Sequence, residues 1–226
     1  MSERHHLLIA DDHPLVRQAL VQAIQSELSA ARFSEAASLE ETLALLDADS
    51  EVDLLLLDLN MPGMQGFSGL FYLRSAYPHI AIVMISATED ETAIRRAMDY
   101  GAAGFIPKSA PIDTIRAAIR ALLRGERWVP DPSTLDGKPG RLGGDARLAA
   151  QLNSLTRQQL RVLMLLTEGK LNKQIAYELS ITEATVKAHV SAILQKLDVS
   201  SRTQAVILAQ RLKPDELDSG VTGASD

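Results

Sequence analysis

The sequence has no cysteine, which excludes disulfide bonds and any metal site built on thiolates. It also has no apolar run near the ~20 residues that a helix needs to cross a bilayer, and its first residues are polar. No internal repeat is visible. We therefore expect a soluble, cytoplasmic protein with no membrane partner, in which His5 and His6 lie at the surface and hold no metal.

With 226 residues, the chain is long for one domain and has enough apolar content to give each of two domains a core. From residue 7 to about 124, short apolar runs alternate with amphipathic segments. The amphipathic segments cover 14–28, 39–46, 66–77, 91–100 and 111–124. This alternation predicts an α/β domain with a doubly wound, five-stranded parallel sheet.

Carboxylates follow two of the predicted strands. The apolar run 54–57 ends in Asp58, and the run 7–10 is followed by Asp11 and Asp12. Because the carboxyl ends of parallel strands meet at one edge of a sheet, we expect the three carboxylates to lie together there. Taken alone, Asp12 could equally be a helix cap. Three carboxylates repel one another unless a cation lies between them, and hard oxygen ligands without a nearby Cys or His pair favour Mg²⁺ over zinc.

Two further strands end in groups that suit the same edge. Ser86 follows the apolar run 82–85, and Lys108 follows the run 104–107. A carboxylate nucleophile, a metal, a hydroxyl and an ammonium group together supply what phosphoryl transfer needs. Taken singly, Ser86 and Lys108 are ordinary loop residues and Phe105 is a core residue. The order in which all of them occur favours a shared site.

At this point the chain resembles a response-regulator receiver domain of the CheY type, over roughly residues 5 to 125. The resemblance implies phosphorylation by a sensor histidine kinase, with an aromatic residue and a hydroxyl that respond to the phosphate. It assigns these roles: phosphoacceptor, Asp58; Mg²⁺ ligands, Asp11, Asp12, Asp58 and the backbone carbonyl of Asn60; phosphate-contacting lysine, Lys108; switch residues, Ser86 and Phe105. We accordingly assign 5–126 to the receiver.

The alternating pattern stops at the only tryptophan, Trp128. The segment 127–151 is dense in proline and glycine, which predicts a linker, with a short helix near its end. We expect Trp128 to pack on the preceding domain. The tail 214–226 is acidic and rich in small residues, which predicts disorder.

The segment 152–213 is helical by period. Gly169 ends a first helix, Asn172 is expected to cap a second, and Thr182 is expected to cap a third helix over 183–197. The third helix has an apolar inward face and a small or polar outward face at Ala184, Lys187, Ala188, Ser191 and Gln195. This pattern is typical of a helix-turn-helix that presents a recognition helix to a major groove.

Charge is distributed unevenly between the two parts of the chain. The segment 152–213 carries nine basic and four acidic residues, a net of +5, whereas the chain as a whole carries −6 and the remainder therefore −11. A basic module joined to an acidic one is expected to bind a polyanion with one end only. A helical bundle with solvated lysines explains the charge alone equally well.

The motifs Asn-Lys-Gln-Ile-Ala at 172–176 and Thr-Val-Lys-Ala-His at 185–189 are similar to those of the LuxR-type helix-turn-helix. With the receiver in front, the whole chain resembles a NarL/FixJ-type response regulator. The resemblance implies that Lys187 and Ala188 face base edges of double-stranded DNA. It places the following residues near the sugar-phosphate backbone: Asn172, Lys173, Thr185 and His189.

The chain departs from the family pattern at a few positions. Gln159 replaces a glutamate at the opening of the first helix, which puts a local contact in doubt. Ser191 stands where some members have a longer basic residue, so one DNA contact is expected to be weaker. Ser109 follows Lys108 where many relatives have proline, and Phe105 stands where tyrosine is frequent.

These observations predict a phosphorylation-controlled transcription factor and not an enzyme. Phosphorylation of Asp58 is expected to favour a homodimer and DNA binding. One alternative is an adaptor or DNA-binding protein that uses the receiver only to dimerise, independently of phosphorylation. Another is a Mg²⁺-dependent aspartyl phosphohydrolase, which would need an acidic residue two positions after the nucleophile, where this chain has Asn60.

Overall fold

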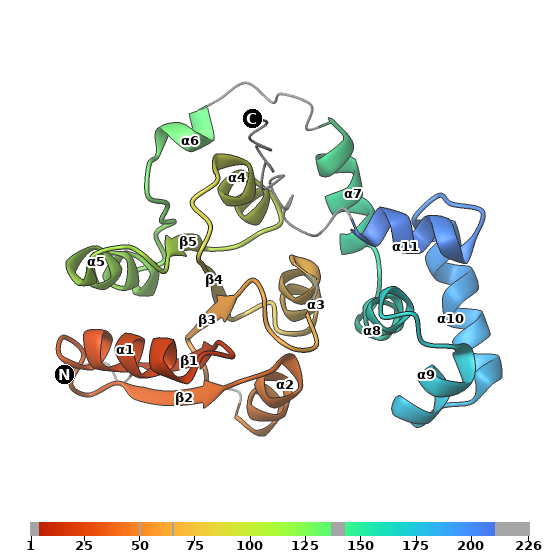
Figure 1. Ribbon diagram of the computed structural model, residues 1–226, viewed down its shortest axis with the longest axis horizontal. Coiled ribbons are helices and arrows are strands. Elements are labelled where there is room, and N and C mark those ends of the chain that lie inside the picture. The colour runs from red at the N-terminus through yellow and green to blue at the C-terminus, as the bar shows by residue number, and fades with distance from the viewer. Residues whose placement is uncertain (1–4, 50, 65, 137–142, 211–226) are drawn as a thin grey trace, which may run out of the picture.

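The computed structural model describes residues 5–49, 51–64, 66–136 and 143–210, and Figure 1 shows their arrangement. The tail 214–226, which we expect to be disordered, lies outside the described residues. None of the helices in the described ranges is both long enough and apolar enough to span a membrane.

Five parallel strands form one sheet in the order β2-β1-β3-β4-β5, which confirms the predicted doubly wound fold. The strands are β1 (His6–Ala10), β2 (Arg32–Ala36), β3 (Leu54–Asp58), β4 (Ala81–Ser86) and β5 (Gly104–Pro107). The edge strand β2 buries only Ala36 among its five residues, so its sequence has no apolar run. For this reason its position could not be predicted from the apolar pattern.

Helices cover both faces of the sheet (Figure 1). The five helices of this domain are α1 (Pro14–Gln25), α2 (Leu39–Ala48), α3 (Ser68–Ala76), α4 (Glu91–Asp99) and α5 (Ile112–Leu123). Leu55 and Leu57 face the core under α2, α3 and α4, whereas Leu54 and Leu56 face the core under α1 and α5. A strand that is buried on both faces accounts for the unbroken leucine run.

The prediction that His6 lies at the surface is wrong, because only 5% of this residue is exposed. It is the first residue of β1, and β2 covers it on one side. The ring atom Nε2 lies 2.9 Å from the Ser34 hydroxyl, and Nδ1 lies 3.0 Å from the Arg32 guanidinium. Both ring nitrogens therefore have partners inside the fold.

The C-terminal part is a helical module, with α8 (Arg157–Thr167), α9 (Asn172–Glu178), α10 (Glu183–Lys196) and α11 (Arg202–Gln210). Thr182 caps α10 as predicted, since its hydroxyl accepts from the Thr185 N–H at 3.1 Å. The prediction that Asn172 caps α9 is wrong. Asn172 is the first helical residue, and the Gln174 side chain reaches back to accept from the Leu171 N–H at 2.7 Å.

Gln159 keeps the contact that its replacement of glutamate put in doubt. Its Oε1 accepts from the Thr156 N–H at 3.0 Å, while the Thr156 hydroxyl accepts from the Gln159 N–H, so a complete capping box starts α8. The same oxygen also accepts from the Lys196 ammonium at 2.9 Å. An amide therefore performs the capping role here without adding a negative charge.

The segment between the two parts contains α6 (Ser133–Asp136) and α7 (Gly143–Asn153). Trp128 packs on the receiver core, as expected, and its backbone also pairs with β5. The Phe105 N–H donates to the Trp128 carbonyl at 3.0 Å, and the Trp128 N–H donates to the Ala103 carbonyl at 3.2 Å. A Cβ on Gly104 would lie 2.8 Å from that Trp128 carbonyl, so only glycine allows this close approach.

The two parts share an interface in which α3 packs against α8 (Figure 1). Arg157 at the start of α8 crosses to the receiver. Its Nε donates to the Tyr72 hydroxyl at 3.0 Å, and its Nη2 lies 3.2 Å from the Tyr77 hydroxyl and 3.3 Å from an Asp47 carboxylate oxygen. Its guanidinium also lies 5.3 Å from the centre of the Tyr77 ring.

Candidate functional site

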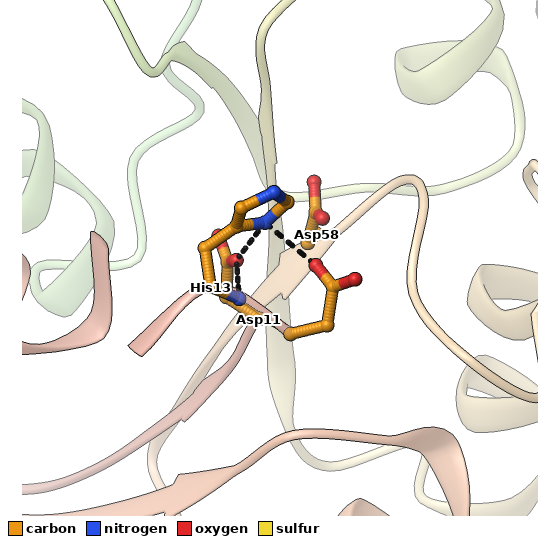
Figure 2. A group of neighbouring side chains, drawn as sticks. Asp11, His13 and Asp58 are labelled. Carbon is orange, nitrogen blue, oxygen red and sulfur yellow. Dashed lines mark hydrogen bonds and ion pairs between the residues drawn. The ribbon is translucent and has the colours of Figure 1, made fainter. Parts of the chain in front are cut away.

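Three carboxylates meet at the carboxyl edge of the sheet. Ala10 of β1 pairs with Leu57 of β3, so the residues that follow, Asp11 and Asp58, lie side by side. Asp11 is 1% exposed and Asp58 is 3% exposed. Asp11, Asp12, His13 and Asp58 each offer one ligand atom, and these atoms all lie within 4.8 Å of one another. Figure 2 shows Asp11, His13 and Asp58 gathered at this edge.

Lys108 supplies the cation nearest to the buried carboxylates. Its Nζ lies 2.6 Å from Asp11 Oδ2 and 3.1 Å from Asp58 Oδ1, and its side chain is 16% exposed. The Lys108 N–H also donates to the Ser86 carbonyl at 2.7 Å, which extends the pairing of β4 and β5 up to the site. Register at the strand ends therefore delivers both Ser86 and Lys108 to the same edge.

Burial and charge act against each other on these groups. Burial raises the pKa of Asp58, and the Lys108 ammonium offsets this only in part, while the neighbouring Asp11 charge raises it further. Burial also acts to lower the pKa of Lys108, but the hydrogen bond to Asp11 and the Asp58 charge outweigh it and raise that pKa. The site therefore stabilises a charged lysine between carboxylates that have lost most of their water.

His13 joins the site, although the sequence analysis did not single it out. Its Nδ1 lies 2.6 Å from Asp12 Oδ1 and 3.1 Å from Asp11 Oδ1, and its backbone N–H donates to Asp11 at 2.8 Å. The ring itself is 64% exposed. Its position directly after the acidic pair was the signal that could have pointed to it.

The oxygens at this edge fit a hard divalent cation. Asp11 Oδ2 and Asp12 Oδ1 are buried, and the nearest side-chain nitrogens are Lys108 Nζ, 2.6 Å from the first, and His13 Nδ1, 2.6 Å from the second. The Asn60 backbone contributes a hydrogen bond to Asp58 that acts to lower the pKa of that carboxyl. Carboxylate oxygens of three residues that lie within 4.8 Å of one another are suitable ligands for Mg²⁺.

Ser86 and Phe105 belong to the two strands on the other side of β3 from β1. Ser86 is buried at the end of β4, and its hydroxyl oxygen accepts from the Thr88 N–H at 3.2 Å. Phe105 is fully buried in β5, within the core under α3 and α4. The aromatic ring is therefore packed inward in this structure.

The predicted DNA-contacting residues lie on a different surface. Lys173, Thr185, Lys187, Ala188 and Ser191 are exposed, while Asn172 and His189 are half-buried. Figure 1 shows α10 on the side of the helical module that faces away from the sheet, with α8 between them. The receiver therefore leaves this face uncovered.

The basic residues of this module serve two different purposes. Four of them are held by internal contacts: Arg161 and Lys170 with Glu178, Lys196 with Gln159, and Arg202 with the Lys170 carbonyl. Lys173 and Lys187 form no ion pair with any residue that the structure describes. The structure thus distinguishes the structural cations from those available to a polyanion, which the net charge could not do.

Comparisons with known proteins match both parts of the chain. A family model for the response regulator receiver domain matches residues 7–120, and one for bacterial regulatory proteins of the luxR family matches residues 153–209. The glycerol metabolism activator of Pseudomonas putida is 45% identical over 209 residues, covering 91% of this chain and 95% of that protein. The transcriptional regulatory protein LiaR of Bacillus subtilis is 34% identical over 206 residues, covering 91% and 96%.

Solved structures agree in fold. The RcsB response regulator of Salmonella typhimurium superposes with a TM-score of 0.55 at 20% identity, covering 93% of this chain and all of that one. An RcsB complex with DNA superposes with a TM-score of 0.53 at 19% identity, covering 92% and 98%. At these identities the likeness extends to the fold alone.

Proposed function

Because this chain belongs to the response regulators with a receiver and a LuxR-type DNA-binding domain, we propose that phosphorylation of Asp58 controls its binding to DNA. The phosphate donor is a sensor histidine kinase, and the phosphorylated chain forms a homodimer on double-stranded DNA. The domains are a receiver over 5–126, a linker over 127–151 and a DNA-binding domain over 152–213. The protein acts in the cytoplasm, where its DNA targets lie.

The observation that carries the proposal is the position of Asp58. Its carboxylate lies 3.1 Å from the Lys108 ammonium and beside a second buried carboxylate, Asp11. In phosphoryl transfer, an Asp58 oxygen attacks the phosphorus in line, and the bond from phosphorus to the histidine nitrogen breaks. Lys108 then exchanges a carboxylate partner for a phosphoryl oxygen without leaving its place.

Mg²⁺ would be held by Asp11, Asp12, Asp58 and the backbone carbonyl of Asn60. When bound, it neutralises charge on the phosphoryl oxygens. The protein itself makes two contributions. Burial keeps water away from Asp58, and the register of β1 and β3 keeps Asp11 and Asp58 adjacent.

The response begins at Ser86 and Phe105. The Ser86 hydroxyl donates to the phosphoryl group, and because it also holds the Thr88 N–H, the loop that leads into α4 moves with it. Phe105 follows into the space that this movement frees, so the surface around α4 and β5 repacks. Two half-sites on one DNA then gain affinity from a dimer.

On the DNA, Lys187 and Ala188 face base edges in the major groove. Backbone phosphates are contacted by Asn172, Lys173, Thr185 and His189, with a weaker contact at Ser191. The exposure of α10 supports these roles, as does the fact that Lys173 and Lys187 pair with no acidic residue in the described part of the chain.

DNA binding measured by fluorescence anisotropy tests the proposal directly. The probe is a promoter fragment from next to the coding region of this protein, with and without beryllofluoride and Mg²⁺, for wild type and Asp58→Ala. We expect tight, salt-sensitive binding only for wild type with beryllofluoride. Equal tight binding in all four samples would contradict control by phosphorylation.

A second function is favoured by one specific observation, the uncovered face of α10. A recognition helix that the receiver does not mask is free to bind DNA without phosphorylation. In that case the receiver serves as a dimerisation or adaptor module, and Asp58→Ala has no effect in the same experiment. A phosphohydrolase remains disfavoured by Asn60, and the relatives are transcriptional regulators.

A further inference from the structure

Two loops border the candidate phosphorylation site beyond the ends of β4 and β5. The first, residues 87–90, joins β4 to α4, and the second, residues 108–111, joins β5 to α5. The Ser109 hydroxyl donates to a carboxylate oxygen of Glu89. Within the described residues, this is the side-chain hydrogen bond that links the two loops to each other.

Each loop is directly attached to one group that would contact a phosphoryl anion. On the second loop, Ser109 immediately follows Lys108, whose Nζ lies 3.1 Å from Asp58. The Lys108 N–H donates to the Ser86 carbonyl at 2.7 Å, which joins the backbones of the two strand ends. The side-chain bond between Ser109 and Glu89 therefore closes a ring around the two strand ends.

On the first loop, a series of local hydrogen bonds connects Glu89 to the switch hydroxyl. The Thr88 N–H donates to the Ser86 hydroxyl at 3.2 Å, and the Asp90 N–H donates to the Thr88 hydroxyl at 3.3 Å. Asp90 in turn caps α4 by accepting from Ala93 at 2.9 Å. Glu89 thus lies between two residues that are fixed, and a restraint on Glu89 restrains Ser86.

Side-chain chemistry makes the link specific. A hydroxyl at position 109 can donate to a carboxylate, which neither alanine nor proline can do from its side chain. The carboxylate at position 89 needs only to accept, so an amide oxygen could replace it. These requirements define which substitutions keep the bond and which remove it.

We propose that Ser109 and Glu89 are positioning residues that hold Lys108 and Ser86 in register for the incoming phosphoryl group. Neither residue touches the phosphate, and neither belongs to the Mg²⁺ ligand set. Their bond therefore affects affinity for a phosphoryl anion without affecting affinity for the metal. The inference rests on the proposed phosphorylation of Asp58 and adds to it the residues that tune the site.

Calorimetric titration of the full-length protein separates the two affinities. Mg²⁺ is titrated alone, and beryllofluoride is titrated at saturating Mg²⁺. We expect Ser109→Ala and Glu89→Ala each to weaken beryllofluoride binding by about three- to tenfold, the range for loss of one hydrogen bond. Binding of Mg²⁺ is expected to stay within about twofold of wild type, since its ligands are untouched.

Conservative variants and a double mutant supply the matched controls. Ser109→Thr keeps the donor and Glu89→Gln keeps an acceptor, so both are expected to bind beryllofluoride like wild type. The double alanine variant is expected to be no weaker than either single variant, because the bond is already lost in each. Thermal unfolding of every variant records any general loss of stability.

Several outcomes would overturn the proposal. Wild-type affinity for beryllofluoride in both alanine variants would show that the bond positions nothing. An equal loss of Mg²⁺ and beryllofluoride affinity, or a loss that Ser109→Thr does not restore, would reveal a merely structural role. If wild type itself takes up no beryllofluoride, the proposed phosphorylation of Asp58 fails, and the positioning role fails with it.

Discussion

The two functional regions of this protein are built in opposite ways. At the sheet edge, Asp11 and Asp58 are buried, and both pair with the half-buried Lys108. On α10, Lys187 is exposed and has no partner among the described residues. The first region satisfies its charges internally, whereas the second keeps a charge for another molecule. Mutations should therefore affect stability at the first and binding at the second.

We expect the largest effect from removing the Lys108 ammonium, which tests whether the sheet edge depends on this cation for stability. Lys108→Ala leaves two buried carboxylates without an ammonium partner, so we expect the free energy of unfolding to fall by about 2–3 kcal/mol in urea. Adding Asp58→Asn should recover most of the loss, because one of the repelling charges is removed. Saturating Mg²⁺ should also restore stability to the single variant. A neutral effect of Lys108→Ala without Mg²⁺ would remove the contrast between the two regions.

The next prediction concerns the exposed region. Lys187→Ala should weaken specific DNA binding by about 1–3 kcal/mol. Lys173→Ala should weaken binding to all DNA sequences alike and reduce the slope of log K against log salt concentration by about 1. Neither should change stability. Lys170→Ala is the matched control, because its ammonium is already paired with Glu178 and Glu168. Anisotropy titrations at several salt concentrations measure these effects, and a salt slope for Lys170→Ala equal to that of Lys173→Ala would contradict the assignment.

Arg157 connects the two modules that carry these regions, so its removal tests whether the modules are held together by its polar contacts. Arg157→Ala loses bonds to Tyr72, Tyr77 and Asp47, so we expect the docking equilibrium of the two modules to weaken by about tenfold. Small-angle scattering should show a more extended protein. Arg161→Ala, whose partner Glu178 lies in its own module, should leave the scattering unchanged. Identical profiles for both variants would show that apolar packing alone holds the modules together.

The smallest effect is a pH dependence at His6. Burial, followed by the Arg32 charge, lowers the pKa of His6 from 6.5, while the Asp53 and Glu51 carboxylates act in the opposite direction. The folded protein therefore binds fewer protons than the unfolded chain below about pH 6.5. Stability should be constant above that pH and fall as the pH drops towards the folded-state pKa, by less than about 1 kcal/mol.

Urea unfolding between pH 7.5 and 5.5 measures this effect in wild type, His6→Gln and His79→Gln. The His6 variant should lose part of the pH dependence. The variant at His79, an exposed residue, should keep it. Equal slopes in all three proteins would mean that the buried histidine does not contribute.

The sheet edge could be predicted from the sequence because its geometry follows from topology. Asp11, Asp58, Ser86 and Lys108 each follow an apolar run, and parallel strand ends must share an edge. His13 was missed because its contact depends on the rotation of its side chain and not on a strand register. The edge strand β2 was not located because few of its residues are buried.

The structure of the helical module could be predicted from the sequence only in part. The period of its apolar residues predicted which face of α10 is buried, with Val186, Ile193 and Leu197 inward. The cap of α9 was predicted wrongly because the helix begins one residue earlier than expected, with Leu171 at the cap position, and the Asn172 side-chain oxygen accepts from Arg202 instead. The contacts of Arg157 could not be predicted, since its partners lie 80 to 110 residues away in the chain.

The pairing of Trp128 with β5 has a practical consequence for isolating the receiver. The strand β5 is at one edge of the sheet, and the Phe105 N–H donates to the Trp128 carbonyl at 3.0 Å. A fragment that ends at residue 126 would expose this edge to strand pairing between molecules, which favours aggregation. A fragment that continues through Val129 carries its own edge protection and should remain monomeric at higher concentration. Residues 127–129 of the proposed linker therefore contribute to the solubility of an isolated receiver through one backbone hydrogen bond.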